Sequence, residues 1–163
     1  DVAPSRGLGD VYKRQGDILL NTTLAETSDW QQVDLSVVST LRHFCIETLS
    51  SYTEDNQACI SEVDLLDDKG QPIDKTKWEV VYVSSEQADK NLGIAENLFD
   101  GDISSFWHTD PATEPGQPHR IIVDIKEIYK ISALRFKVRK GAFLSGKVKE
   151  INVYGRPQFF LFH

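Results

Sequence analysis

Apolar and polar residues alternate in short stretches along most of this chain, a pattern typical of half-buried β-strands. The first clear stretch contains Val33, Leu35 and Val37, which alternate with Asp34 and Ser36. Similar stretches follow at residues 42–51, 59–66, 78–83, 121–126, 134–139 and 148–154. No segment keeps a helical period for more than about three turns. The pattern therefore predicts an all-β fold of about seven or eight short antiparallel strands, arranged as a sandwich or barrel.

Turn-forming and polar segments separate the predicted strands. The run D-D-K-G-Q-P at residues 67–72 is a strong turn signal, and residues 84–96 are polar enough for a short helical turn. Residues 110–118 contain three prolines and one glycine, which predicts a long irregular loop. The apolar phase slips between Val148 and Ile151, and we expect a β-bulge in the last strand.

Composition narrows the class of protein. The chain has 163 residues, of which 40% are hydrophobic and 26% charged, as in one soluble globular domain. Its net charge is −7, and the acidic residues are spread along the chain. Nucleic acids and anionic membranes attract basic surfaces, so we expect neither as a partner. No apolar run approaches membrane-spanning length, so no membrane span is predicted.

The two ends of the chain differ from its middle. Residues 1–15 have no periodicity, and their G-L-G-D-V-Y-K-R-Q run resembles a translated adapter. They are predicted to be a disordered or non-native leader. Residues 16–157 are predicted to form the β-sandwich, followed by an apolar, aromatic tail at residues 158–163.

Two cysteines, Cys45 and Cys59, lie on predicted strands that flank one loop. A disulfide across that hairpin and a pair of buried thiols are both consistent with this placement. Neither cysteine belongs to a C-x-x-C motif, so zinc binding and thioredoxin-like chemistry have no support.

The polar loop at residues 97–109, N-L-F-D-G-D-I-S-S-F-W-H-T, holds the most distinctive chemistry. Asp100, Gly101 and Asp102 offer carboxylate and backbone oxygens around a residue that permits a tight bend. A hard cation such as calcium binds about six to eight oxygens. An ordinary turn is the alternative, because Asp and Gly favour turns without any metal. Phe106 and Trp107 are expected to pin this loop to the core.

The sequence offers no catalytic motif. G-x-S-x-G, H-E-x-x-H and a phosphate-binding glycine loop are all missing from it, and its four histidines are scattered. Asp100 and Asp102 fit a metal loop better than the paired carboxylates of a glycoside hydrolase. We therefore do not expect an enzyme in this chain alone.

Several runs taken together resemble the discoidin family, the coagulation factor V/VIII type C domain. These runs are W-E-V-V-Y-V-S-S-E-Q, A-E-N-L-F-D-G-D-I-S-S-F-W-H-T, P-H-R-I-I-V-D-I, A-L-R-F-K-V-R and G-K-V-K-E-I-N-V-Y. They span residues 78–154 in the family's order, and the likeness is nearest to carbohydrate-binding module family 32. The resemblance implies an antiparallel jelly-roll β-sandwich of the galactose-binding-domain-like kind.

An earlier part of the chain resembles the family's last two strands, but here it comes first. It contains S-T-L-R-H-F-C-I-E-T-L-S-S, followed by A-C-I-S-E-V-D-L-L. The chain either spans the end of one module and the start of the next, or is one module with permuted strand order. In the permuted module, residues 33–67 fill the place of the missing final strands. We favour this second interpretation because it leaves no open sheet edge.

The resemblance also implies a structural calcium ion, held by the D-G-D loop and a glutamate-bearing strand. The family usually has Thr where Ser105 stands, a change that keeps the oxygen. Carried over position by position, the expected ligands are the carbonyls of Ser61, Asn97 and Asp102, the carboxylates of Glu62 and Asp100, and the hydroxyl or carbonyl of Ser105.

Sugar-binding members of the family use loops at one end of the sandwich. Trp107, His108 and Arg139 match their features, but Ser145 stands where the family has Asn, which puts galactose-type recognition in doubt. Arg offers a fork of donors to vicinal hydroxyls, and an exposed Phe143 would stack on a sugar ring. Each residue also has a simpler interpretation. Trp107 would be core, His108 would bond a backbone carbonyl, Arg139 would pair with an acid and Phe143 would cover the sandwich end.

These features predict a non-catalytic carbohydrate-binding module of a secreted, periplasmic or cell-surface glycan-processing protein. It would carry structural calcium and adjoin other domains, such as those of a larger glycoside hydrolase. The alternatives are a protein- or cell-surface-adhesion module and a structural spacer domain, both of the same fold without a sugar site.

Overall fold

The computed structural model describes residues 17–53, 55–112, 116–139 and 146–157 of the chain. The predictions for residues 1–15 and 158–163 lie outside these residues. The elements are β1 (Asp17–Thr23), β2 (Gln31–Thr48), β3 (Cys59–Ile60), β4 (Glu62–Asp67), β5 (Glu79–Val83), the 3-10 helices η1 (Asp89–Asn91) and η2 (Ala95–Phe99), β6 (Trp107–His108), β7 (His119–Lys137) and β8 (Glu150–Arg156). All the strand pairs they form are antiparallel, which confirms the predicted all-β fold.

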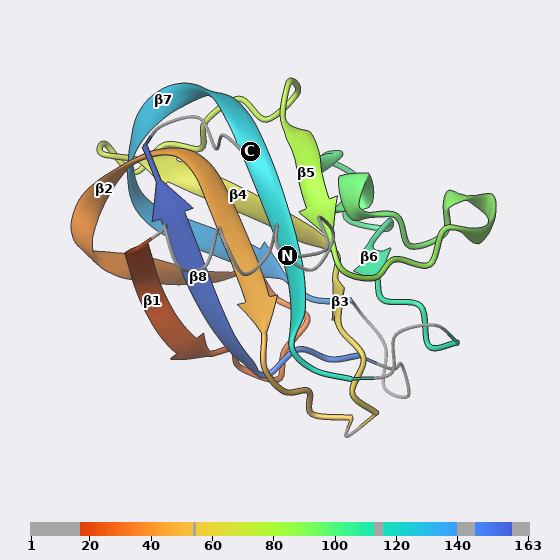
Figure 1. Cartoon of the computed structure of the whole chain (residues 1–163). Helices are drawn as coiled ribbons and strands as arrows, with labels where there is room; N and C mark the ends of the chain where they lie inside the picture. The colour runs from red at the N-terminus through yellow and green to blue at the C-terminus, as the bar shows by residue number, and fades with distance from the viewer. Residues whose placement is uncertain (1–16, 54, 113–115, 140–145, 158–163) are drawn as a thin grey trace, which may run out of the picture.

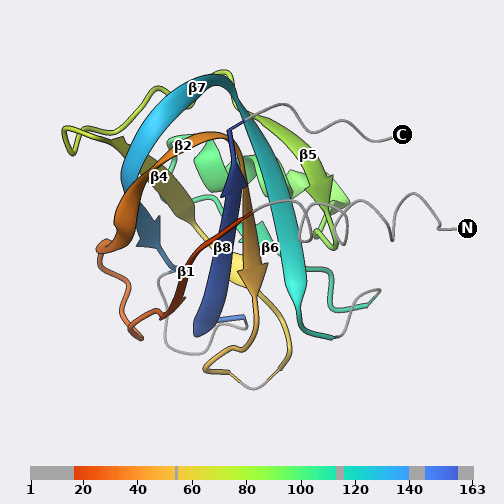
Figure 2. The ribbon, with the colours of Figure 1, turned by 60° about the vertical axis from the view of Figure 1, so that its left-hand side comes forward.

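Two long strands, β2 and β7, connect the layers of the sandwich. β2 has 18 residues and β7 has 19, and both arch over the body in Figures 1 and 2. The main sheet has the order β1-β8-β2-β7-β4, and β5 also pairs with β7. The first half of β7 pairs with β5 through residues 121–124, whereas its second half pairs with β4 through residues 131–137. Each long strand therefore contributes to both layers.

The core lies between these layers, on the apolar faces that the alternation predicts. Phe44 on β2 and Phe136 on β7 are fully buried, and Trp78 is 6% exposed. The ring centroid of Trp78 lies 5.5 Å from that of Phe44 and 5.5 Å from that of Phe99, just before the D-G-D loop. Aromatic contacts of this kind stabilise a core beyond the area that they bury. They also anchor the start of the loop to the sandwich.

The strand boundaries differ from the prediction in an informative way. Stretches 121–126 and 134–139 were predicted as two strands, but they form one strand, β7, that ends at Lys137. Register shifts between Asp34 and Ser39 and between Leu41 and His43 in β2 let the pairing continue around the bend. Bulges add twist and curvature without ending a strand. The interruption of the apolar alternation between residues 126 and 134 therefore marks a bend within one strand and not a turn between two strands.

Other predictions fail or move by a few residues. The stretch 59–66 is split at Ser61 into β3 and β4, because β3 pairs with β6 in a separate two-stranded sheet. The predicted sandwich starts at residue 16, but the prediction names no strand for the residues that form β1. The bulge predicted between Val148 and Ile151 is not found there, because β8 begins only at Glu150. A register shift lies instead in β1 between Ile18 and Leu20, opposite Tyr154 and Val153 of β8.

Two smaller questions from the sequence are answered by the structure. Cys45 and Cys59 form no disulfide with each other, and both are buried thiols. No helix in the described part of the chain is long and apolar enough to cross a membrane.

Candidate functional site

The D-G-D loop follows η2 and is organised by its own side chains. Asp100 Oδ1 accepts a hydrogen bond from the Asp102 amide at 2.9 Å, and Oδ2 accepts one from Ser105 Oγ at 2.5 Å. Gly101 has a φ of +80°, a conformation that favours glycine. Hydrogen bonds from the hydroxyl and amide of Ser104 lower the pKa of the Asp102 carboxyl. These hydrogen bonds favour the charged form of the Asp102 carboxylate.

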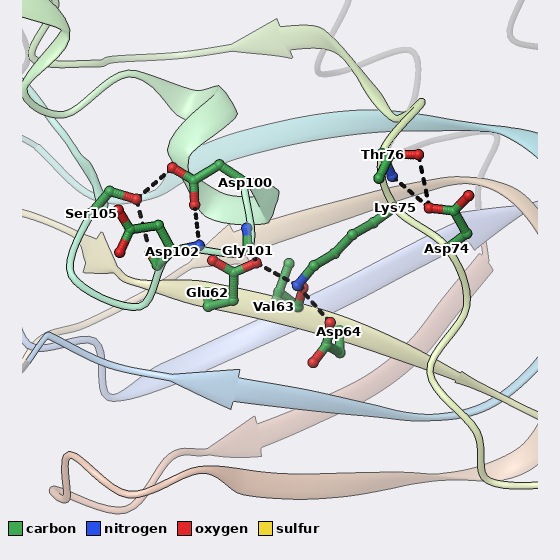
Figure 3. Close-up of polar contacts among 10 residues, drawn as sticks. All are labelled: Glu62, Val63, Asp64, Asp74, Lys75, Thr76, Asp100, Gly101, Asp102 and Ser105. Atoms are coloured by element: carbon green, nitrogen blue, oxygen red, sulfur yellow. Dashed lines mark hydrogen bonds and ion pairs between the residues drawn. The ribbon is translucent and has the colours of Figure 1, made fainter.

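Glu62 connects this loop to a strand from the first half of the chain. It opens β4 and is 1% exposed, and its Oε2 accepts a hydrogen bond from the Gly101 amide at 3.0 Å. Figure 3 shows the carboxylate of Glu62 beneath the loop. The two residues are 39 positions apart in the sequence. A strand from the first half therefore supports the acidic loop, as the permuted-module interpretation requires.

Lys75 is a site residue that the sequence did not reveal. Its Nζ forms an ion pair with Glu62 Oε2, lies 2.5 Å from Asp64 Oδ1 and donates to the Val63 carbonyl at 3.1 Å (Figure 3). Lys75 lies between β4 and β5, in a segment without periodicity. The sequence has no motif of fixed spacing that connects Lys75 to Glu62. The two residues come together because the chain folds back along β4.

The second oxygen of Glu62 has a different environment. Among the described residues, Glu62 Oε1 is buried without a hydrogen-bond partner. Burial raises the pKa of this carboxyl above its ordinary value, and the charge of Asp100 adds to the rise, although Lys75 and the Gly101 amide oppose it. A buried oxygen without a partner costs free energy unless a cation or water satisfies it.

The oxygens near this carboxylate fit the ligand chemistry of calcium. Glu62 and Asp100 supply carboxylates, and the carbonyl of Asp102 and the hydroxyl of Ser105 lie in the same loop. No three His, Cys, Asp or Glu side chains of the described chain converge as a metal set. Any cation here would therefore depend partly on backbone and hydroxyl oxygens, which calcium accepts readily.

Two further expected ligands brace the surroundings of the loop. The side-chain amide of Asn97 donates to the Phe106 carbonyl at 3.1 Å and to the Asn91 carbonyl at 3.2 Å. Ser61 is 2% exposed, and its amide donates to the Lys137 carbonyl at 2.8 Å. The contacts of Asn97 link the start of the loop to its end and to η1, whereas the Ser61 contact ties the junction of β3 and β4 to the end of β7.

Trp107 and His108 are placed differently from the predicted sugar-binding surface. Trp107 is fully buried, and its indole Nε1 donates to the Ser85 carbonyl at 3.0 Å. His108 is 4% exposed, and its Nδ1 donates to the Thr109 carbonyl at 2.5 Å. Both belong to β6, whose pairing with β3 carries them into the interior. These positions agree with the simpler interpretations: Trp107 is a core residue, and His108 bonds a backbone carbonyl.

Arg139, in contrast, lies at the edge of a cavity. Its guanidinium carbon is 4.0 Å from the centroid of the Phe106 ring, a cation–π distance. The simpler alternative to a sugar-binding role for Arg139 was an acidic partner, whereas the contact seen here is with the Phe106 ring. The cavity has a volume of about 420 Å³ and is lined by Ser61, Ile103, Ser104, Phe106, Lys137, Val138 and Arg139.

Most of these lining residues were not identified from sequence. Lys137 and Arg139 are two positions apart near the end of β7, so strand alternation could have placed them on one face. Ile103 is 54% exposed, an unusual position for a large apolar side chain beside a polar loop. The remaining predicted ligand residues, Phe143 and Ser145, lie outside the described residues.

Cys59 is a buried residue that interacts with Arg139. Burial raises the pKa of its thiol to about 12, although the charge and hydrogen bond of Arg139 oppose the rise. A thiol with so high a pKa is a poor nucleophile near neutral pH. The Cys59 thiol beside Arg139 is therefore not an activated nucleophile.

The structure thus combines an antiparallel β-sandwich with the acidic D-G-D loop and with the cavity beside Arg139. The sequence model of the F5/8 type C domain family matches residues 80–158. This range covers the segment whose motifs resemble that family, and residues 80–158 are therefore similar to F5/8 type C, or discoidin, sequences.

A sialidase from Micromonospora viridifaciens is also similar to this chain. The two are 33% identical over 84 residues, which make up 50% of this chain and 13% of the sialidase. The similarity is thus confined to a small part of that longer protein. Strands β1 to β4 precede the residues matched by the family model, yet each of them pairs with a strand inside the matched region. Strands β1, β2 and β4 do so in the main sheet, and β3 does so in the two-stranded sheet with β6.

Proposed function

We propose that this chain is a non-catalytic carbohydrate-binding module of a secreted glycan-processing protein. The F5/8 type C match and the likeness to part of a sialidase support this proposal. A sialidase acts on glycans, and a module attached to such an enzyme raises its local concentration at the substrate. The short similar region relative to the whole sialidase agrees with a module among other domains.

The cavity beside Arg139 is the observation that carries the proposal. Its volume of about 420 Å³ suits a small-molecule site. The guanidinium presents several donors in a fixed fork, which matches adjacent sugar hydroxyls. Ile103 adds an exposed apolar surface against which the apolar face of a pyranose can pack. A single sugar buries little area in a cavity of this size, so we expect weak binding per module.

Replacing Arg139 with alanine is expected to weaken sugar binding at least about ten-fold, because it removes charged hydrogen-bond donors. The measurement is calorimetric titration with galactose-terminated and sialic-acid-terminated oligosaccharides. Arg135→Ala is the matched control: Arg135 lies on β7, four positions before Arg139, donates to Gln32 Oε1 at 3.2 Å and lies outside the cavity lining. Circular dichroism checks that both variants fold.

Two results would contradict the sugar site. Wild-type protein that binds none of these sugars at millimolar concentration would favour an adhesion or spacer role for the same fold. Unchanged affinity in Arg139→Ala would place the sugar elsewhere on the surface.

We further propose that the D-G-D loop binds a structural calcium ion through Asp100, Asp102, Ser105 and Glu62, with Asn97 and Ser61 contributing carbonyls. The oxygen donors and the buried, unpartnered Glu62 Oε1 support this assignment. Bound calcium would neutralise the two carboxylates and fix the loop beside the sugar cavity.

Removing calcium is therefore expected to lower the melting temperature, since an ion that binds only the folded state stabilises the folded protein. Thermal unfolding is measured in calcium and in excess chelator, with magnesium as the control cation. Identical curves in calcium and chelator would contradict the calcium site.

A further inference from the structure

Lys75 makes the contacts that a bound cation would make. Its ammonium touches three oxygens: a carboxylate oxygen of Glu62, Asp64 Oδ1 at 2.5 Å and the Val63 carbonyl at 3.1 Å. Lys75 is only 16% exposed, and Glu62 is 1% exposed. A buried carboxylate is stable in its charged form only with a counter-charge, and this chain supplies one of its own.

The carboxylate of Glu62 is divided between two environments. Its Oε2 contacts Lys75 and the Gly101 amide, whereas its Oε1 is buried without a partner among the described residues. A calcium ion that used Oε1 would thus share one carboxylate with an ammonium group. Two positive charges at such close range repel each other strongly where water is scarce.

Space beside Lys75 allows this conflict to be relieved. Lys75, Thr76, Glu96, Phe99, Asp100 and Gly101 line a cavity of about 380 Å³. This cavity lies next to the acidic loop but has none of the residues that line the Arg139 cavity. The flexible side chain of Lys75 can therefore leave Glu62 for the cavity without disturbing β4.

We propose that Lys75 is a tethered cation that competes with calcium for Glu62 and holds the D-G-D loop in place when calcium is scarce. This inference rests on the calcium site proposed above and gives that site a built-in competitor. Calcium binding then requires displacement of Lys75, so the affinity for calcium is lower than the oxygen ligands alone would give. The loop keeps its shape over a wider range of calcium concentration.

The test replaces Lys75 with methionine, which keeps a long apolar stem and removes the charge. Calcium chloride is titrated into wild-type protein, Lys75→Met and Lys75→Arg, and binding is followed by calorimetry. We expect Lys75→Met to bind calcium about ten-fold more tightly than wild type, and Lys75→Arg to stay near wild type. Lys77→Met is the matched control, because Lys77 is exposed two positions away in the same segment.

Thermal unfolding gives a second readout. In chelator, Lys75→Met should melt below wild type, because Glu62 has lost its counter-charge; added calcium should restore most of the difference. Wild type and Lys75→Arg should respond less to calcium than Lys75→Met does.

The outcomes separate this inference from the calcium site itself. Equal affinity in wild type and Lys75→Met would overturn the competition while leaving calcium binding intact. No calcium binding by any variant would overturn both. A Lys75→Met protein that stays unfolded in calcium would also overturn the competition, because calcium would then fail to replace the ammonium.

Discussion

Replacing Trp107 with alanine is expected to lower the free energy of unfolding by about 3–5 kcal/mol, the usual cost of removing a large buried aromatic residue. The side chain is fully buried, and its indole nitrogen bonds the Ser85 carbonyl at 3.0 Å. The substitution creates a cavity and leaves that carbonyl without its donor. Denaturant unfolding monitored by circular dichroism measures the change.

Trp30 provides the control for this prediction, because it is 41% exposed. Trp30→Ala should change the free energy of unfolding by less than about 1 kcal/mol. A Trp107→Ala protein that keeps its stability but loses sugar binding would return Trp107 to the surface role suggested by family resemblance.

Replacing Glu47 with alanine is expected to cost about 2–3 kcal/mol of unfolding free energy, since it removes a buried acceptor from several donors. The carboxylate accepts hydrogen bonds from Arg120 Nε at 2.7 Å, Asn152 Nδ2 at 3.0 Å and Tyr154 Oη at 3.1 Å. Glu47 is 1% exposed, whereas Arg120 is 19% exposed and can recover some hydration. We therefore expect a smaller loss of unfolding free energy than for a fully buried ion pair.

An exposed ion pair of the same sheet serves as the control. Glu79 Oε1 lies 2.6 Å from Lys126 Nζ, with side chains 63% and 38% exposed respectively. Glu79→Ala should change stability by no more than about 1 kcal/mol. Equal losses for Glu47→Ala and Glu79→Ala would contradict the buried network.

The Glu47 network also offers a spectroscopic check on the same variant. Burial and the negative charge of Glu47 raise the pKa of Tyr154 to about 12. Removing the charge should lower that pKa toward the ordinary value for tyrosine, so its phenol ionises at lower pH. An ultraviolet titration of tyrosinate follows this change.

The alternation of apolar residues was enough to predict the all-β fold, because it sets which face of each strand is buried. Phe44, Leu134 and Phe136 are buried as the pattern requires. The pattern could not reveal how far a strand runs once it bends. β7 continues through residues 127–130, because bulges in its partner keep the two strands paired.

Motif order added what periodicity could not. It placed the D-G-D loop near a glutamate from the first half of the chain, and the hydrogen bond from the Gly101 amide to Glu62 joins these two segments. It misplaced Trp107 and His108, because a motif position does not say which way a residue on a short strand faces. Only the pairing of β6 with β3 decides that orientation.

Lys75 shows the limit of sequence analysis at this site. It lies in a segment between β4 and β5 with neither periodicity nor a family motif, 13 positions after Glu62. Its role depends on the chain folding back along β4, which places the ammonium beside two acidic residues. Long-range ion pairs of this kind leave no local signal.

Nuclear magnetic resonance provides the most direct test of a binding site built from both halves of the chain. Amide chemical shifts are recorded while an oligosaccharide that binds in the calorimetric titration is added to calcium-loaded protein. The proposed site predicts joint changes at Ser61 from the first half and at Ile103, Ser104 and Arg139 from the second, since these residues line one cavity. Changes confined to β1 and β8, with Ser61 and Arg139 unaffected, would contradict it.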